Sequence, residues 1–172
     1  AIAQLAKKFW VCDINNPDEV YSIVKNENVD LAFASPDAVL AAGISDALEK
    51  AGALVASPTK SAARIEWDKS YMRELLSKHK IAGAIKYVLT NERKEIEKTV
   101  KDFGSVAVKP LGLTGGKGVR VSGDHFNTIE EAIKDAEEIA RKDGTVLIEE
   151  KIEGEEFSLQ AFSDGKRIFT MP

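Results

Sequence analysis

Glycines and lysines between residues 106 and 121 form the part of the sequence best suited to bind a charged ligand. A short apolar run that ends in Val108-Lys109 gives way to a loop with glycine at positions 112, 115, 116 and 118. Glycines at this density permit positive φ values, or let the backbone approach another group closely. Lys109 and Lys117 place a positive charge at each end of the loop. Because open backbone N–H groups and point charges suit a polyphosphate, the stretch predicts a phosphate-binding loop.

The spacing of these residues excludes two familiar phosphate loops. A P-loop has four residues between its first glycine and its Gly-Lys pair, and then serine or threonine. Here only three residues separate Gly112 from Gly116, and another glycine follows Lys117. A dinucleotide fingerprint leads directly into a helix, whereas residues 119–121 alternate valine and arginine as a strand does. We therefore expect a strand–glycine loop–strand hairpin that folds over phosphates. A flexible hairpin tip with scattered lysines is the alternative that these residues leave open.

The composition describes an ordinary globular protein. A length of 172 residues allows one medium domain or two small ones. The net charge of −4 gives no support for nucleic acid binding. Cys12 is the single cysteine, which fits a reducing compartment, and its apolar neighbours predict a buried structural thiol. No apolar run approaches the roughly 20 residues of a membrane span, and no targeting pattern is present. We expect a cytoplasmic protein, a monomer or weak homo-oligomer, without nucleic acid or membrane partners.

The first part of the chain alternates strands and helices. The expected strands are 9–12, 29–34 and 53–56, and the expected helices begin at Asn16-Pro17 and at Pro36, the second ending at Gly52. This alternation predicts right-handed βαβ units around a parallel sheet, in a Rossmann-like arrangement. Ligands of such sheets bind beyond the carboxyl ends of the strands. Candidate ligand-binding positions are therefore 35–37, 57–59 and the turn after Asp13.

The second part predicts a small α+β unit. A helical stretch from Lys60 to Lys80, interrupted near Asp68-Lys69, leads into it. Its expected elements are strand 85–89, helix 91–103, the strand and hairpin around Lys109, a helix opened by the capping box that starts at Thr128, and strand 146–148. An acidic cluster follows at 149–156. Such a cluster is most often solvated charge, yet at a strand end its carboxylates could accept from a ribose hydroxyl or an exocyclic amine, and a backbone N–H could meet an adenine nitrogen.

Four segments in this order resemble the phosphoribosylamine–glycine ligase family, also called glycinamide ribonucleotide synthetases, of the ATP-grasp superfamily. Residues 35–40, Ser-Pro-Asp-Ala-Val-Leu, are similar to the family's Gly-Pro-Glu-Ala-Pro-Leu segment, and residues 57–69 to the segment that leads into its first ATP lysine. Residues 108–118 resemble its strand and glycine loop, although Pro110-Leu111 stand where the family often has Ala-Asp. Residues 148–156 resemble the hinge that holds adenosine. The resemblance runs along essentially the whole chain.

The resemblance implies a fold in three parts. Residues 1–84 are expected to form the βαβ domain that precedes the ATP-grasp fold, together with a connecting helix. Residues 85–152 are expected to form the small ATP-grasp lid subdomain, and residues 153–172 to begin the larger subdomain. Because both ends of the sequence look cut, we expect a piece of a longer protein.

The resemblance also implies a reaction. ATP phosphorylates the carboxylate of glycine, and the amine of 5-phosphoribosylamine attacks the glycyl phosphate, in a step of purine biosynthesis. Lys69 and Lys109 are implied to hold the α- and β-phosphates, Glu150 and the backbone near Ile152 to read adenine, and Glu156 to bind the ribose. The implied nucleotide-binding residues are Lys69, Lys109, Gly115, Gly116, Lys117, Gly118, Glu149, Glu150, Ile152 and Glu156. Ser35, Pro36 and Asp37 are implied to help hold phosphoribosylamine.

The resemblance assigns no catalytic or metal-binding residue to this chain. The ligands of the Mg²⁺ (or Mn²⁺) ions that accompany ATP are expected beyond residue 172, so the 172-residue chain alone is expected to be inactive in ligation. Other hypotheses stay open. Another ATP-grasp carboxylate–amine ligase or a carboxylase segment would share the lysines and the hinge, but it accounts less well for residues 35–40. A non-catalytic nucleotide-binding module and a βαβ interaction domain without a ligand belong to other functional classes.

Overall fold

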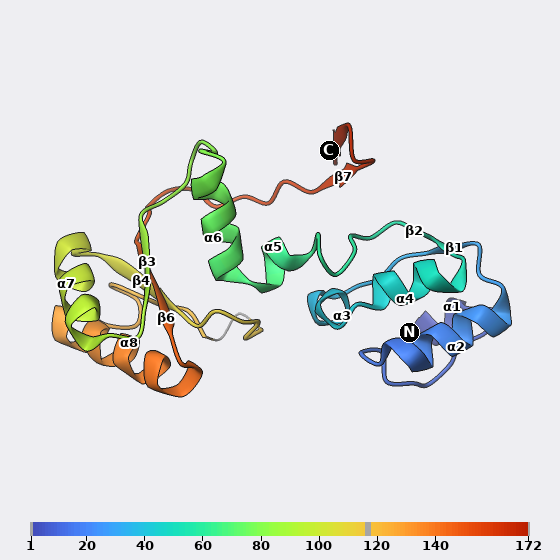
Figure 1. The fold of residues 1–172 in the computed structure, drawn as a ribbon, viewed down its shortest axis with the longest axis horizontal. Coiled ribbons are helices and arrows are strands. Elements are labelled where there is room, and N and C mark those ends of the chain that lie inside the picture. The colour runs from blue at the N-terminus through green and yellow to red at the C-terminus, as the bar shows by residue number, and fades with distance from the viewer. Residues whose placement is uncertain (1, 116–117, 172) are drawn as a thin grey trace.

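The structure, a computed structural model, describes residues 2–115 and 118–171. Its elements form two units joined by a helical connection (Figure 1). The first unit contains α1 (Ile2–Leu5), α2 (Pro17–Glu27), β1 (Leu31–Ala32), α3 (Asp37–Ala42), α4 (Ile44–Ala51) and β2 (Leu54–Val55). The connection consists of α5 (Arg64–Trp67) and α6 (Lys69–Lys78). No helix within the described ranges is both long and apolar enough to cross a bilayer.

The first unit has the predicted parallel βαβ order. β1 and β2 pair in parallel, with Leu31 opposite Leu54. Asn16 caps α2 by accepting hydrogen bonds from the backbone N–H groups of Asp18 and Glu19, and Pro17 is the first helical residue, as the sequence predicts. The small core between sheet and helices contains Ala34, Val39, Ile44 and Leu48.

Three predictions about this region are wrong. Residues 9–12 form no strand, because a strand needs a hydrogen-bonded neighbour and no described segment pairs with them; Cys12 there is only half-buried. The single helix expected from Pro36 to Gly52 is instead two helices, α3 and α4. Gly43 ends α3, because it adopts a φ of 92° and its N–H donates to the Leu40 carbonyl.

The second unit has a four-stranded sheet in the order β3-β6-β4-β5, with all neighbours antiparallel. Its strands are β3 (Tyr87–Thr90), β4 (Val106–Lys109), β5 (Arg120–Val121) and β6 (Val146–Glu150), and its helices are α7 (Arg93–Phe103) and α8 (Ile129–Asp143). The predicted capping box is present at the start of α8, where Thr128 and Glu131 each accept a hydrogen bond from the other's backbone N–H. The α+β composition expected here is confirmed.

The two faces of this sheet have different chemistry. Alternate residues of β4 and β6, including Val106, Val108, Val146 and Ile148, pack into a core with α7 and α8 on one side of the sheet. The intervening residues Lys109 and Glu149 point to the other face, where Arg73 of α6 contacts Glu149. Figure 1 shows α6 on the side of the sheet opposite α7 and α8. The central strands are therefore apolar toward the helical layer and charged toward α6.

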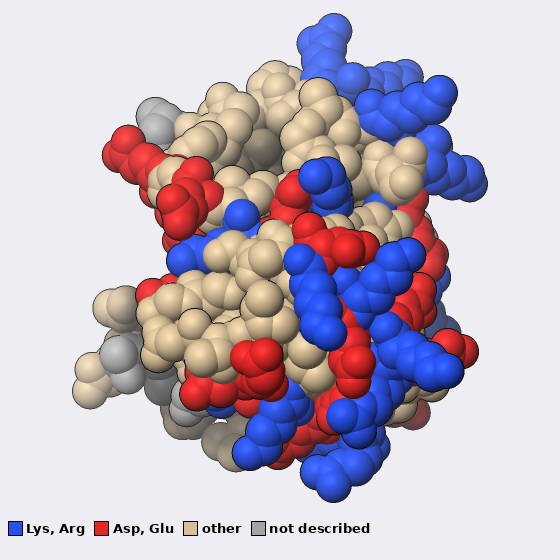
Figure 2. All heavy atoms as spheres, turned by 90° about the vertical axis from the view of Figure 1, so that its left-hand side faces the viewer, with Lys and Arg blue, Asp and Glu red and all other residues tan. Residues whose placement is uncertain are grey.

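The outer surface of this unit carries mixed charges. In Figure 2, basic and acidic side chains lie side by side over much of the face that is shown. Ion pairs account for part of this pattern, since Arg93 pairs with both Glu97 and Glu137, and Arg120 pairs with Asp135. Beyond β6, the chain ends in an antiparallel hairpin of β7 (Ala161–Ser163) and β8 (Ile168–Thr170), whose residues are exposed.

Candidate functional site

The register of the sheet brings Lys109 and Glu149 together. In the β4–β6 pairing, Lys109 lies opposite Leu147, and Glu149 lies opposite Ala107. The two charged residues are therefore diagonal neighbours on one face, a spacing that long side chains can bridge. Lys109 Nζ lies 2.5 Å from Glu149 Oε2. A lysine at the end of a buried strand thus has the partner that burial demands.

Helix α6 adds a second cation that the sequence reasoning missed. Arg73 Nε donates a hydrogen bond to Glu149 Oε1 at 2.5 Å. The signal was available, because Arg73 stands four residues after Lys69 and these positions share one face of a helix. Without knowing that this face lies against the sheet, Arg73 could not be distinguished from a solvated charge.

Burial makes this cluster unusual. The Glu149 side chain is 2% exposed, Arg73 13% and Lys109 21%. A buried carboxylate is tolerated when it is paired and hydrogen-bonded, and here each carboxylate oxygen has its own cation. One anion between two cations leaves one net positive charge. The cluster can therefore attract a further anion without leaving Glu149 unpaired.

Lys69 joins the same region from the first turn of α6. Asp68 caps this helix by accepting a hydrogen bond from the Tyr71 N–H at 3.0 Å. The backbone N–H of Lys69 donates to the Leu111 carbonyl at 3.3 Å, and its Nζ donates to the Gly112 carbonyl at 2.8 Å. Burial and the nearby Lys109 charge hold the pKa of Lys69 below its ordinary value, against the opposing effects of Glu66 and Glu149. Lys69 and Lys109 thus stand at the root of the glycine loop.

The glycine loop connects β4 to β5 as a hairpin, which confirms the predicted strand–loop–strand order. Gly115 has a φ of 60°, a left-handed conformation that favours glycine. Gly118 lies against the start of the loop: an added Cβ would come within 2.7 Å of the Pro110 ring and of the Thr114 hydroxyl. The predicted ligand residues Gly116 and Lys117 lie outside the described residues.

Gly118→Ala should lower the free energy of unfolding by about 1–3 kcal/mol, because the new methyl group would overpack the contact with Pro110 and Thr114. Gly112→Ala is the matched control, since an added Cβ there would meet no atom within 4 Å. Urea unfolding of both variants measures the difference. Equal stability of the two variants would show that the close contact does not constrain the loop.

The hinge residues divide into paired and exposed side chains. Glu150 accepts a hydrogen bond from the Lys86 backbone N–H at 2.9 Å and lies 3.6 Å from Lys86 Nζ. Ile152 is 63% exposed, and Glu156 is exposed as well. Both oxygens of Glu149 are occupied by Lys109 and Arg73. Direct contact of any of these side chains with a nucleotide stays a prediction.

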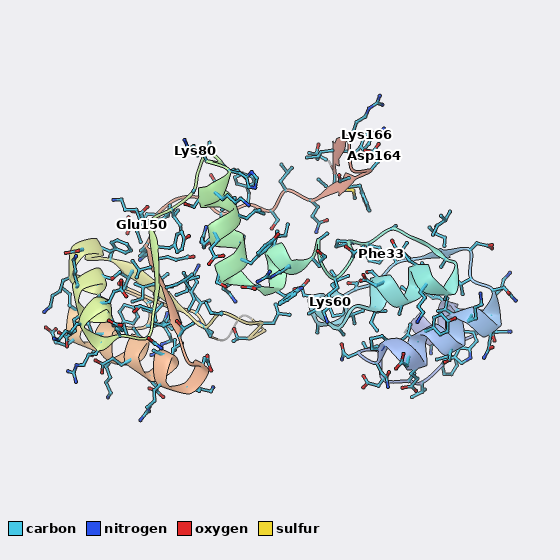
Figure 3. The ribbon with its side chains drawn as sticks, in the orientation of Figure 1. Phe33, Lys60, Lys80, Glu150, Asp164 and Lys166 are labelled. Carbon is cyan, nitrogen blue, oxygen red and sulfur yellow. The ribbon has the colours of Figure 1, made fainter. Side chains whose placement is uncertain are left out.

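The residues predicted for a second substrate lie apart from the lysines. Ser35 and Pro36 are exposed between β1 and α3, and Asp37 is exposed as the first residue of α3. The backbone before them is held by Ser57, whose hydroxyl both accepts from the Ala34 N–H and donates to the Ala34 carbonyl. Figure 3 shows Phe33, next to this segment, and Glu150 in different units on opposite sides of α6. The structure does not bring residues 35–37 to the lysine cluster.

The chemistry of the cluster suits anion binding. Two lysines, a glycine loop and a net positive charge can neutralise phosphates. Over residues 2–115 and 118–171, no group of three or more His, Cys, Asp or Glu side chains is arranged to hold a metal ion.

Comparison with known proteins identifies two domains of one family along the chain. The family described as phosphoribosylglycinamide synthetase, N domain, matches residues 1–66. The family described as phosphoribosylglycinamide synthetase, ATP-grasp (A) domain, matches residues 67–172.

Individual relatives agree with this match. The phosphoribosylamine–glycine ligase of Pyrococcus horikoshii is 42% identical over 172 residues, which cover 99% of this chain and 39% of the relative. That of Methanothermobacter thermautotrophicus is 46% identical over 159 residues, 90% of this chain and 36% of the relative. The crystal structure of phosphoribosylglycinamide synthetase from Anaerococcus prevotii has a TM-score of 0.65 at 27% identity, covering 98% of this chain and 41% of that one. The chain thus spans about two fifths of the length of these relatives.

Proposed function

Because the chain belongs to the phosphoribosylglycinamide synthetase family, we propose that it carries the nucleotide-binding half of an ADP-forming ligase that joins glycine to 5-phosphoribosylamine. The observation that carries this proposal is the convergence of Lys69 and Lys109 at the root of the glycine loop, beside the buried Glu149. The proposed reaction forms glycyl phosphate from ATP and glycine. Attack by the amine of 5-phosphoribosylamine then releases phosphate and yields glycinamide ribonucleotide, a step of purine biosynthesis.

Catalysis of this kind depends mainly on positioning and on charge neutralisation. Lys69 and Lys109 neutralise the α- and β-phosphates in this proposal, and the loop from Gly112 to Gly118 closes over them as a lid. In this proposal, the backbone N–H groups of Gly115 and Gly118 face the phosphates. Lys69 supports this role, because a cation that is partly desolvated and repelled by Lys109 gains more from a phosphate than a solvated lysine does.

The hinge after β6 holds the adenosine in the same proposal. Glu150 and the backbone of Ile152 contact adenine, and Glu156 accepts from the ribose hydroxyls. Glu150 would exchange its contact with Lys86 for the base, which is inexpensive because that ion pair is largely solvated. Mg²⁺ or Mn²⁺ accompanies the ATP phosphates, with ligands outside this chain.

The proposed division of the chain follows the elements. Residues 1–84 form the domain that precedes the ATP-grasp fold, residues 85–152 the small lid subdomain, and residues 153–172 the beginning of the larger subdomain. Ser35, Pro36 and Asp37 help hold 5-phosphoribosylamine, which requires the first unit to approach the lysine cluster in the whole protein. We propose a cytoplasmic location, since the substrates are metabolites of purine synthesis.

A thermal melt with and without magnesium–ATP tests the nucleotide site. Ligand at 100–1,000 times its dissociation constant should stabilise the wild-type chain by roughly 2.7–4.1 kcal/mol. The shift should vanish in Lys109→Ala and persist in Lys98→Ala, which removes an exposed lysine of α7. Absence of a shift both in this chain and in the full-length protein would contradict the proposal. Full-length protein that binds ATP without glycine-dependent ADP release would instead be a non-catalytic nucleotide-binding module.

Nucleotide binding should take up protons at alkaline pH. The pKa of Lys69 lies below its ordinary value in the free protein, and a nearby phosphate favours the charged form, so binding raises this pKa. ATP affinity should therefore fall as the pH rises through the pKa of Lys69 in the free protein. Titration calorimetry near pH 9 in two buffers of different ionisation enthalpy measures the uptake. Lys69→Arg is the control, because arginine stays protonated and should abolish this part of the uptake.

A further inference from the structure

Arg73 has no role in the proposed reaction, although its side chain is more buried than that of Lys109. We propose that Arg73 is a positioning residue for nucleotide binding: by holding the charge of Glu149, it releases Lys109 to bind phosphate. This inference rests on the proposed function and assigns to Arg73 an effect transmitted through Glu149.

Glu149 divides its two carboxylate oxygens between two cations. Arg73 Nε binds Oε1, and Lys109 Nζ binds Oε2, both at 2.5 Å. The carboxylate is 2% exposed, so water does not replace a lost partner. Whatever draws Lys109 away must leave Glu149 with another compensating charge, because an unpaired buried carboxylate is strongly unfavourable.

The two cations differ in exposure and in flexibility. Lys109 is the more exposed of the two, and it ends β4 directly before the glycine loop. Its flexible stem and point charge allow it to turn from Glu149 toward a phosphate in that loop. Arg73 lies within α6, is 13% exposed, and presents a planar guanidinium that suits a fixed carboxylate partner. Lys109 is thus the mobile cation and Arg73 the stationary one.

Without Arg73, Glu149 and an incoming phosphate would compete for Lys109. Glu149 would then have Lys109 as its only ion-pair partner among the described residues. An incoming phosphate would compete with a buried carboxylate for one ammonium group. With Arg73 present, the phosphate takes up the net positive charge that the cluster already carries. Arg73 therefore strengthens phosphate binding without touching the nucleotide.

A double-mutant cycle measures this coupling. Calorimetry should show that Arg73→Met raises the Kd for magnesium–ATP at least about fivefold. In a Glu149→Gln background, the same substitution should change the Kd by less than about twofold, because the competing carboxylate is gone. Equal losses in both backgrounds would mean that Arg73 binds the nucleotide directly, and would overturn the inference. A lowered melting temperature with an unchanged Kd in Arg73→Met would mean a purely structural contact, and would also overturn it.

Arg73→Lys keeps the test valid if Glu149→Gln proves too unstable. Lysine preserves the compensating charge, so the Kd of Arg73→Lys should stay closer to the wild-type value than that of Arg73→Met. Equal losses in the two Arg73 variants would contradict charge compensation. Failure of the wild-type chain and of the full-length protein to bind ATP would overturn the proposed function along with this inference. Wild-type binding with an unchanged Kd in Arg73→Met would overturn the inference alone.

Discussion

Glu149→Gln should lower the free energy of unfolding by about 3–5 kcal/mol, the usual consequence of removing one partner from a buried ion pair. The substitution keeps the shape of the side chain but leaves Arg73 and Lys109 facing each other across a neutral amide. Both cations are largely buried, so water compensates them poorly. Urea denaturation of wild type and variant, monitored by far-UV circular dichroism, measures the loss of unfolding free energy.

Glu150→Gln is the matched control, because Glu150 is the next residue of β6 and, among the described residues, pairs only with the exposed Lys86 ammonium and with a backbone N–H. Its loss should stay within about 1 kcal/mol, as expected for a solvent-exposed ion pair. The double variant Arg73→Met/Glu149→Gln should lose less than the sum of its single variants, since residues in one network are not additive. Equal losses for Glu149→Gln and Glu150→Gln would mean that the buried cluster contributes no more than a surface pair.

The parts of the site that lie next to each other in the sequence could be predicted from it. The apolar run before Lys109, the glycines after it and the valines at 119 and 121 specify a hairpin by local periodicity and turn chemistry alone. The capping box at Thr128 fixed the start of α8 in the same way. The mixed fold of the two units follows from such local signals.

Contacts between distant segments could not be predicted in this way. The face of α6 that carries Arg73 becomes informative only when the antiparallel register places Glu149 beneath it, and periodicity does not reveal register. The prediction of a strand at residues 9–12 was wrong for a related reason. Apolar residues favour a strand, but a strand forms only where a neighbouring strand supplies hydrogen-bond partners. The family resemblance named the two lysines and the glutamates but gave no reason to consider the arginine between them.

The cluster and the loop also depend on each other. Lys69 holds the loop through the carbonyl of Gly112, and Lys109 begins it, so movement of the loop changes the surroundings of both cations. The other end of the hairpin is fastened to β4 by Ser122, whose N–H donates to the Val106 carbonyl at 3.0 Å and whose hydroxyl accepts from the Val106 N–H at 2.9 Å. If the glycine loop closes as the proposed lid, a base of this kind confines its motion to the residues between the two strands.

Phe126→Ala should remove this rigid base and lower the free energy of unfolding by about 3–5 kcal/mol. Phe126 is 3% exposed in the core shared with α7 and α8, although it stands in an irregular segment that no periodic pattern marks as buried. Its carbonyl accepts the Gly123 N–H at 2.8 Å, and Ser122 forms a bridge with it. The phenyl ring therefore anchors the turn that follows β5, between Ser122 and Phe126, and its loss would leave a large cavity in the core.

Phe157→Ala makes the same chemical change at a side chain that is 84% exposed, and it should alter stability by no more than about 0.5 kcal/mol. Phe126 is distant in sequence from Lys69 and Lys109. The effect of Phe126→Ala on nucleotide binding therefore tests whether binding requires a rigid base of the hairpin. We expect Phe126→Ala to reduce the stabilisation by magnesium–ATP even at temperatures where the variant is fully folded by circular dichroism. A full ligand-induced shift in that variant would mean that the glycine loop binds phosphate without support from the base of the hairpin, through Lys69 and Lys109 alone.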